Sequence, residues 1–378
     1  MNNLSDIRMH TPGPGNIPWF VRLASISQIA HHRDSFFKEI YSELQSNLQC
    51  IFKTSDPVLI MTCSGTGAME SVVKNIVNAD DSVLVIDTGK YSHRWADILK
   101  ISNIKVNVIK PNVEGHLVPY INIETALSNV YPRFVFVSHT ETSTGVTYDL
   151  QRLSKLCKKN GAKLVVDAMA TVGVQPLYKD EWDIDVVISA SHKGFMNAPG
   201  LGFVCIKQEY LNRLSSNSLY FDFKSCSKYR DLNTTQNSPA TSLILGVHAA
   251  TKYMCQEGVE NVWKRHKKCA EICRAGIKAI GLKTYSCDSF GNGVTAVVAP
   301  EGIPSSKIIA YMKKEFGIMI ANGQDDLKEK IFRLGHIGAV IPIDIIHLIT
   351  SLEMTLCQIT GETYKAKGTI AAWNEFSK

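Results

Sequence analysis

Apolar and polar positions change along the chain in a way that predicts strands and helices following one another. Short runs rich in β-branched residues have the length of strands, and segments with apolar residues at helical spacing follow most of them. Strands are expected at 58–62, 82–87, near 106, 134–138, 163–167 and 186–188, with a second apolar run ending at 205. Helices are expected at 34–52, 68–77, around 95–99, 121–130 and 150–160. This alternation predicts an α/β fold built on a mostly parallel sheet.

The pattern changes in the second half of the chain. Residues 217–239 are expected to be rich in loops, followed by helices at 240–257, 262–280 and 305–316 and by strands at 294–298 and 332–334. Residues 11–18 are too rich in Pro and Gly for a helix or a strand. We therefore expect an N-terminal arm over 1–20, a large domain over 21–255 and a smaller C-terminal α+β domain over 256–378.

Composition and charge narrow the class of protein. The 378 residues are 45% apolar and 20% charged, as in an ordinary soluble enzyme. The net charge of +6 is spread along the chain, and the densest basic run, 264–268, falls inside a predicted helix, so nucleic acid is not expected as a partner. No apolar run approaches the length of a membrane span and no secretory signal begins the sequence, so we expect a cytoplasmic protein without a membrane partner.

The 10 cysteines fit a reducing compartment because none forms a CxxC pair. His266, Cys269 and Cys273 have a spacing that brings three metal-capable groups near one helical face. A fourth ligand is missing nearby. We therefore expect buried free cysteines beside a surface histidine, and no metal.

Candidate chemical groups follow the predicted strands. The carboxyl ends of parallel strands share one edge of a sheet, where ligands bind. Lys193 follows the strand at 186–188, with apolar neighbours that suit an amine used for a Schiff base. Asp167 closes an apolar strand, and such a carboxylate costs free energy to bury unless it meets a cation. Ser64, Tyr91 and Thr142 complete the set of groups expected on this edge.

Three of these groups have a second interpretation. The turn at 64–67 passes from a strand into a helix, so its free N–H groups and hydroxyls suit a phosphate, but it is equally well explained as a helix cap. Tyr91 is placed to stack on a planar ligand or to pack at the rim of the sheet. The hydroxyl-rich residues 139–145 are explained by turn chemistry.

Taken together, these residues resemble the class V, fold-type I pyridoxal-phosphate aminotransferases, in the branch of alanine–glyoxylate and serine–pyruvate aminotransferases. The resemblance runs over nearly the whole chain. It is carried by Pro12-Gly-Pro-Gly15, Ser64-Gly-Thr66, Glu141-Thr-Ser-Thr-Gly145, Val166-Asp167, Ser191-His-Lys-Gly194 and Arg333-Leu-Gly335. It implies a fold-type I large domain plus a smaller domain, and pyridoxal 5'-phosphate as cofactor.

The resemblance also implies a role for each site residue. Lys193 would form the Schiff base and then move a proton between the substrate and the coenzyme, while Asp167 would pair with the pyridinium nitrogen. Arg333 would bind the substrate carboxylate through its planar fork. The implied cofactor-binding residues, besides these, are Ser64, Gly65, Thr66, Tyr91, Thr142, His192 and Asn237.

One stretch departs from the family pattern. Relatives often send an aromatic residue and a Thr-x-Pro element to the phosphate of the neighbouring subunit, and here the matching residues are 234–239. Asn237 replaces the threonine as a hydrogen-bond donor, but Thr234 has no aromatic ring to offer. A homodimer remains the expectation.

The expected reaction is transamination between a small amino acid, alanine- or serine-like, and a 2-oxo acid such as pyruvate or glyoxylate. A 2-aminoethylphosphonate transaminase is one alternative, with Arg33 or His32 as further cationic groups. A cysteine desulfurase or lyase is another; no cysteine follows Arg333 directly, but Cys287 keeps the option open. A third alternative is a protein with this fold that is retained only for binding or regulation. The presence of Lys193, Asp167 and Arg333 speaks against it.

Overall fold

The computed structural model describes residues 7–27, 31–211 and 216–378. A seven-stranded sheet forms the centre, with strand order β2-β8-β7-β6-β5-β3-β4. Its strands are β2 (Val58–Thr62), β3 (Val83–Ile86), β4 (Val106–Ile109), β5 (Phe134–Ser138), β6 (Lys163–Asp167), β7 (Val186–Ala190) and β8 (Leu201–Ile206). From β7 to β4 all neighbours are parallel, and β8 alone runs antiparallel to both of its neighbours. The mostly parallel α/β sheet expected from the sequence is therefore confirmed.

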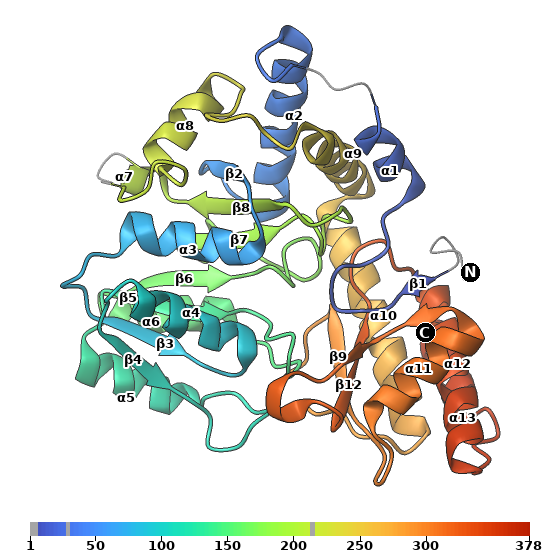
Figure 1. Cartoon of the computed structure of the whole chain (residues 1–378). Coiled ribbons are helices and arrows are strands. Elements are labelled where there is room, and N and C mark those ends of the chain that lie inside the picture. The colour runs from blue at the N-terminus through green and yellow to red at the C-terminus, as the bar shows by residue number, and fades with distance from the viewer. Residues whose placement is uncertain (1–6, 28–30, 212–215) are drawn as a thin grey trace.

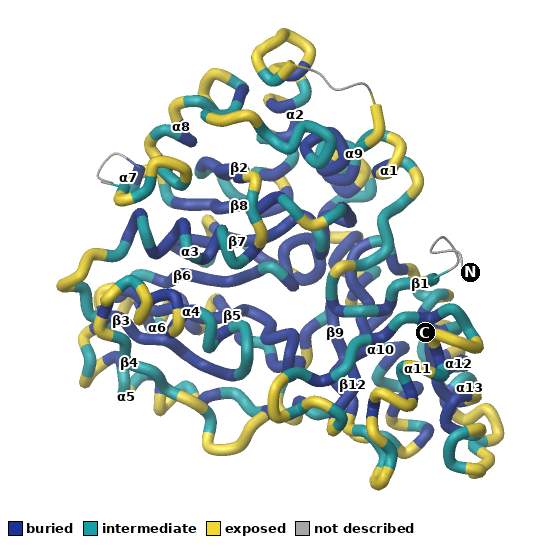
Figure 2. Tube along the Cα trace, viewed as in Figure 1, coloured by how far each residue is buried: buried dark blue, intermediate teal, exposed yellow. Residues whose placement is uncertain are grey.

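Helices cover both faces of this sheet, which leaves most of its strands buried (Figures 1 and 2). One face packs on α3 (Gly65–Ile76), α4 (Lys90–Ile101) and α8 (Phe223–Asp231). The other packs on α2 (Ser35–Phe52), α5 (Tyr120–Val130), α6 (Leu150–Lys159) and α9 (Thr241–Glu257). Two short helices, α1 (Trp19–Ser25) and α7 (Gln208–Leu211), complete this part of the chain. Strands buried on both faces explain the continuous apolar runs in the sequence.

The C-terminal part has a hydrophobic core of its own, drawn from residues 269–372. It contains α10 (Val259–Ala279), β9 (Val294–Val298), α11 (Ser305–Phe316), β10 (Ile318–Met319), β11 (Ala321–Asn322), the 3-10 turn η2 (Asp325–Leu327), β12 (Ile331–Gly335), α12 (Pro342–Thr360) and α13 (Lys367–Phe376). An antiparallel sheet of order β11-β12-β9 lies beside the helices. Strand β1 (Arg8–Met9) pairs in parallel with β10, so the segment at β1 lies against the C-terminal part.

Helix α12 corrects one expectation from the sequence. By length and composition this 19-residue helix is long and apolar enough to span a membrane, although we expected no such run. Half of its apolar window is buried in the protein. Residues such as Ile345, Leu352 and Leu356 belong to the C-terminal core. Packing within the protein therefore accounts for the apolar character of α12.

Three local predictions were wrong in detail. The stretch 217–239 contains the helix α8, which Asp222 caps by accepting the N–H of Lys224. Ser189 and Ala190 continue β7, because β7 pairs with β8 through Ala190. His266 is buried and not at the surface, since Gly338 N donates to its Nε2 at 3.0 Å. Burial lowers the pKa of His266 to about 3.

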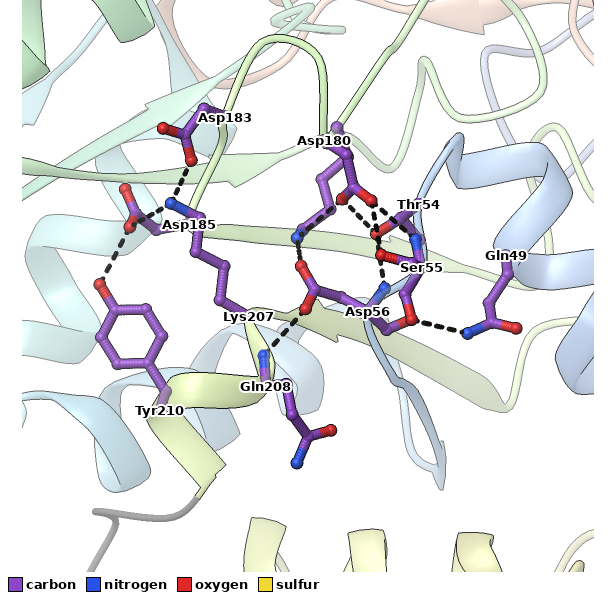
Figure 3. A network of polar contacts seen from close by, with 11 residues as sticks. Gln49, Thr54, Ser55, Asp56, Asp180, Asp183, Asp185, Lys207, Gln208 and Tyr210 are labelled. Carbon is purple, nitrogen blue, oxygen red and sulfur yellow. Dashed lines mark hydrogen bonds and ion pairs between the residues drawn. The ribbon is translucent and has the colours of Figure 1, made fainter.

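A network of charged side chains gathers where β2 and β7 begin (Figure 3). Lys193 follows the other end of β7. Lys179 is fully buried and its amine contacts Asp56 and, at 3.4 Å, Asp180. Asp180 also accepts hydrogen bonds from residues just before β2: Ser55 N donates to it at 2.7 Å. The network ties the segment before β2 to the segment before β7.

Candidate active site

Lys193 lies in the turn that follows β7, with only 8% of its surface exposed. Its amine donates a hydrogen bond to the carbonyl oxygen of Pro12 at 2.6 Å, and it lies 5.9 Å from the centre of the Tyr91 ring. Burial lowers the pKa of this amine to about 8. The positive charge of Arg333 also lowers this pKa, whereas the negative charge of Asp167 raises it. A lysine with such a pKa is partly neutral at physiological pH, so it can act as a nucleophile and a base.

Asp167 ends β6, between Ser138 on β5 and Ile188 on β7. It is 5% exposed, and its Oδ1 accepts the backbone N–H of Met169 at 3.0 Å. Within the described part of the chain, its other oxygen accepts no hydrogen bond. Burial raises the pKa of this carboxyl to about 6, and the Lys193 amine works against that rise. Asp167 is thus a buried acid with one oxygen that accepts no hydrogen bond from residues 7–27, 31–211 or 216–378.

Ser64, Gly65 and Thr66 form the start of α3. Ser64 caps the helix by accepting the N–H of Gly67 at 3.2 Å. The N–H groups of Gly65 and Thr66 donate to no group in the described residues. Arg94, on α4, donates from its Nη1 to the hydroxyl of Thr66 at 3.0 Å. Two free N–H groups, a hydroxyl and a guanidinium at a helix N-terminus are a suitable set for a phosphate.

Gly65 has a packing requirement as well. A Cβ at this position would lie 2.2 Å from the sulfur of Met169, which follows Asp167 closely in sequence. The turn at the start of α3 is therefore pressed against the segment after β6. This close approach brings the predicted phosphate cradle and the acid to the same edge of the sheet.

Tyr91 lies in the first turn of α4, and its ring is bounded on several sides. The Arg94 guanidinium lies 5.1 Å from the ring centre. Gln324, from the C-terminal part, donates its Nε2 to the Tyr91 hydroxyl at 3.2 Å. Glu141 accepts the backbone N–H of Tyr91 at 3.0 Å. Contacts from α4, from the loop after β5 and from the C-terminal part therefore hold Tyr91 beside the lysine.

Arg333 lies on β12 and reaches the large domain. It is 6% exposed, and its Nη1 donates to the carbonyl oxygen of Thr142 at 3.2 Å and to Gln324 Oε1 at 3.3 Å. Its Nε donates to the carbonyl oxygen of Asn322 at 2.9 Å. Burial lowers the pKa of this guanidinium from its usual value. Arg333, Thr142, Tyr91 and Lys193 are thus neighbours, although they come from four separate segments.

The two remaining predicted residues differ in placement. His192 is half-buried beside Lys193, and burial lowers the pKa of its imidazole to about 4, with a further contribution from Lys193. Asn237 is exposed and lines a small depression with Tyr220 and Thr62 instead. Thr234, in the same stretch, donates its hydroxyl to the carbonyl oxygen of His32.

A cavity adjoins this site. It measures about 420 Å³ and lies between the start of α4 and the segment at 324–327. Its walls include Arg94, Ser143 and Gln324, but neither Lys193 nor Asp167. The reacting groups are therefore identified by their hydrogen bonds and pKa shifts, and not by the size of a cavity.

Sequence reasoning missed three residues of this arrangement: Arg94, Glu141 and Gln324. Glu141 lies within residues 139–145, whose composition was interpreted as turn chemistry. The feature that could have identified it is a carboxylate among mostly hydroxylated neighbours. Arg94 is one helical turn beyond Tyr91, so its spacing placed it on the same side of α4. Nothing in the sequence around Gln324 links it to the sheet, because its contacts depend on how the C-terminal part packs.

These residues fit pyridoxal 5'-phosphate. A lysine with a lowered pKa suits the aldehyde, a buried carboxylate with a vacant oxygen suits the ring nitrogen, and the N-terminus of α3 with Arg94 suits the phosphate. The fold and the site together define a pyridoxal-phosphate-dependent enzyme of fold-type I.

Comparison with known proteins agrees with this class. The family model for class V aminotransferases matches residues 22–335, so the chain belongs to that family. Its members that act as transaminases use pyridoxal 5'-phosphate, and this chain is a PLP-dependent aminotransferase.

Three similar proteins cover nearly the whole chain. The soluble hydrogenase 42 kDa subunit of Anabaena cylindrica is 34% identical over 96% of this chain and 96% of its own length. The serine–glyoxylate aminotransferase of Hyphomicrobium methylovorum is 33% identical over 97% of this chain and 94% of its own. The structure of ureidoglycine–glyoxylate aminotransferase from Bacillus subtilis superposes with a TM-score of 0.93 at 24% identity, covering 98% of both chains. This last likeness confirms the fold.

Proposed function

We propose that the protein transfers an amino group from a small amino acid, alanine- or serine-like, to a 2-oxo acid such as glyoxylate or pyruvate. The observation that carries this proposal is the meeting of Arg333 with Lys193 and Asp167 in one buried site. An α-carboxylate bound by the arginine leaves the α-carbon of the substrate beside the lysine. Similarity to a serine–glyoxylate aminotransferase supports the choice of substrates.

The coenzyme, when bound, supplies an electron sink for the bond that breaks at the substrate α-carbon. Lys193 would hold the coenzyme covalently and, once displaced by the substrate, take the proton from the α-carbon and return it at coenzyme carbon C4′. A pKa of about 8 favours this proton transfer, because a lysine with the usual, higher pKa would stay protonated at neutral pH.

Asp167 would keep the ring nitrogen protonated. Its pKa of about 6 describes the protein alone, where burial opposes the charge. A cationic ring nitrogen beside it would favour the ionised carboxylate, since opposite charges stabilise each other most where water is excluded. His192 would lie next to the lysine as a neutral side chain, given its lowered pKa.

Arg333 is held in the orientation that binds a carboxylate before the substrate binds. Contacts with Asn322 and Thr142 hold the guanidinium in one orientation, so little side-chain entropy remains to be lost on binding. Because the planar fork matches a carboxylate, Arg333 would fix the α-carboxyl group common to amino donors and 2-oxo acceptors.

The alternatives find less support in the positions of their residues. Cys287 is exposed, and its Sγ contacts the carbonyl oxygen of Tyr285 at 3.6 Å, as part of a loop that packs on Gly115. Cys63 precedes the phosphate cradle, but burial raises the pKa of its thiol to about 11, which opposes thiolate chemistry. Arg33 lies over the ring of Tyr229 on α8, at 5.8 Å, and not beside Arg333.

We also propose a homodimer in the cytoplasm. Exposed Asn237 would serve the coenzyme of a second copy. Trp19 and Leu23 on α1, with Ile26 directly after it, offer apolar surface for a partner. Ten free thiols support a reducing compartment. Light scattering coupled to gel filtration tests the assembly, and a monomer at micromolar concentration would contradict the dimer.

The reaction is tested with purified protein and added pyridoxal 5'-phosphate. Single amino acids are supplied in turn, and conversion to the pyridoxamine form is followed by absorbance, with glyoxylate or pyruvate then used to reverse it. We expect conversion with alanine or serine and none with Lys193→Ala. Sulfide released from cysteine, without amino transfer, would instead identify a desulfurase.

A further inference from the structure

Glu141 holds the first turn of α4 through a buried carboxylate. The residue has no exposed surface and lies in the loop after β5. Its Oε2 accepts three hydrogen bonds, from Tyr91 N at 3.0 Å, Ser92 N at 2.8 Å and Ser92 Oγ at 3.0 Å. A carboxylate at a helix N-terminus satisfies N–H groups that the helix leaves unpaired and interacts favourably with the helix dipole.

The other oxygen of Glu141 fixes its own loop. Oε1 accepts the N–H of Ser143 at 3.1 Å and its hydroxyl at 2.7 Å. Gly89, just before α4, leaves room for this side chain, since a Cβ there would lie 2.7 Å from Glu141 Cγ and 3.0 Å from its carboxyl carbon. Within the described residues, the two oxygens together accept five hydrogen bonds. The loop after β5 and the start of α4 are therefore joined through one charged group.

The charge of Glu141 also changes the pKa values of two reacting groups. It raises the pKa of Asp167 and it raises the pKa of Lys193. A negative charge that accepts hydrogen bonds from all sides cannot move away, so its field at these two residues is fixed.

We propose that Glu141 is a positioning residue of the coenzyme site, which fixes Tyr91 beside Lys193 and supplies a negative charge that favours protonated, cationic forms of the bound coenzyme. The inference rests on the proposed function, because it assigns a task at the same site. It adds a carboxylate that does not contact the substrate and whose effect passes through Tyr91, Asp167 and Lys193.

Two variants separate position from charge. Glu141→Gln keeps the shape but must turn its NH₂ group toward donors, either those of Tyr91 and Ser92 or those of Ser143. Glu141→Asp keeps the charge but shortens the side chain. For Glu141→Gln we expect the Kd for pyridoxal 5'-phosphate to rise on the order of 10- to 100-fold, as for a buried donor left without a partner. For Glu141→Asp we expect a smaller rise.

The charge is tested by the pH titration of the visible band of the bound coenzyme. In Glu141→Gln the midpoint should move to lower pH, because removal of a negative charge makes the protonated form less stable. In Glu141→Asp the midpoint should stay near that of the wild type. Asp149→Asn is the matched control: it removes the carboxylate that caps α6, where Asp149 accepts the N–H of Arg152 at 3.0 Å, and should change neither Kd nor midpoint.

A wild-type Kd with an unshifted midpoint in Glu141→Gln would overturn the inference. If that variant does not fold, a wild-type Kd in Glu141→Asp would overturn it. Wild-type protein that binds no pyridoxal 5'-phosphate would instead refute the proposed function, so the two failures are distinct.

Discussion

The amine of Lys193 donates a hydrogen bond to the carbonyl oxygen of Pro12, across 181 positions of sequence. The N-terminal segment is brought there by β1, which pairs with β10 of the C-terminal part. The lysine is therefore enclosed by the start of the chain, the central sheet and the C-terminal part together. This contact explains why a Pro- and Gly-rich segment far from the sheet belongs to the site.

Gly13→Ala is expected to disturb the lysine directly. A Cβ at residue 13 would lie 2.5 Å from Lys193 Cδ and 2.8 Å from Nζ, and the φ of +128° is one that residues with side chains rarely adopt. We expect covalent attachment of the coenzyme to fall at least about tenfold, measured by borohydride reduction and mass spectrometry of the Lys193 peptide.

Gly161→Ala separates crowding from backbone strain. Gly161 also has a positive φ, of +70°, but a Cβ there would meet nothing within 4 Å. This control should lose some stability and attach the coenzyme normally. Equal attachment in Gly13→Ala and in the wild type would show that the segment does not confine the lysine.

The lowered pKa of Lys193 predicts how attachment depends on pH. Only the neutral amine attacks an aldehyde, and the neutral fraction grows as pH rises through the pKa. The attachment rate should therefore rise with a midpoint near pH 8, and not near the usual pKa of 10.5.

The variant Arg333→Gln tests the origin of this midpoint. Arg333 contributes to lowering the pKa of Lys193, so its removal should move the midpoint to higher pH. Stopped-flow absorbance on apo-protein measures both profiles. A wild-type midpoint near 10.5 would mean that the amine is solvated before the coenzyme binds.

Arg333→Lys tests the carboxylate contact. The fork of an arginine makes two parallel hydrogen bonds to a carboxylate, whereas a lysine offers a single charged group. We expect kcat/KM for the amino donor to fall on the order of 100-fold, with the affinity for the coenzyme nearly unchanged, in a steady-state assay. Arg133→Lys, at an exposed ion pair with Asp81, is the control and should keep full activity.

Much of this site could be predicted, because a parallel sheet brings the residues at the ends of adjacent strands close together. Asp167 ends β6 and Lys193 follows β7, and these strands are adjacent and parallel, so their positions relative to apolar runs already place them together. Ser64 was also placed correctly at the start of a helix, although the helix begins at Gly65 and not at Ala68.

Contacts between distant segments could not be predicted in the same way. Gln324 reaches Tyr91 only because the C-terminal part packs on the large sheet, and no periodic pattern records that packing. The helix α8 was missed because few of its residues are apolar, so its mixed polar sequence resembles a loop. Burial of His266 likewise depends on Gly338, 72 positions later.

Lys179→Met tests the charged network where β2 and β7 begin. The lysine is 0% exposed, and its removal would leave Asp56 and Asp180 without their cation. Breaking a buried ion pair costs about 3–5 kcal/mol, and we expect the lower end, about 3 kcal/mol, because these side chains keep 19% and 37% exposure. Guanidinium denaturation of the apo-protein measures the loss.

The double variant Lys179→Met with Asp56→Asn decides whether charge is the cause. It removes one of the carboxylates left unpaired, so it should be more stable than Lys179→Met alone, since an apolar and a neutral side chain tolerate burial better than a lone charge. Coenzyme affinity should stay the same in both variants, because this network lies where β2 and β7 begin and Lys193 lies where β7 ends. A double variant as unstable as the single one would assign the loss to packing around the lysine chain and not to its charge.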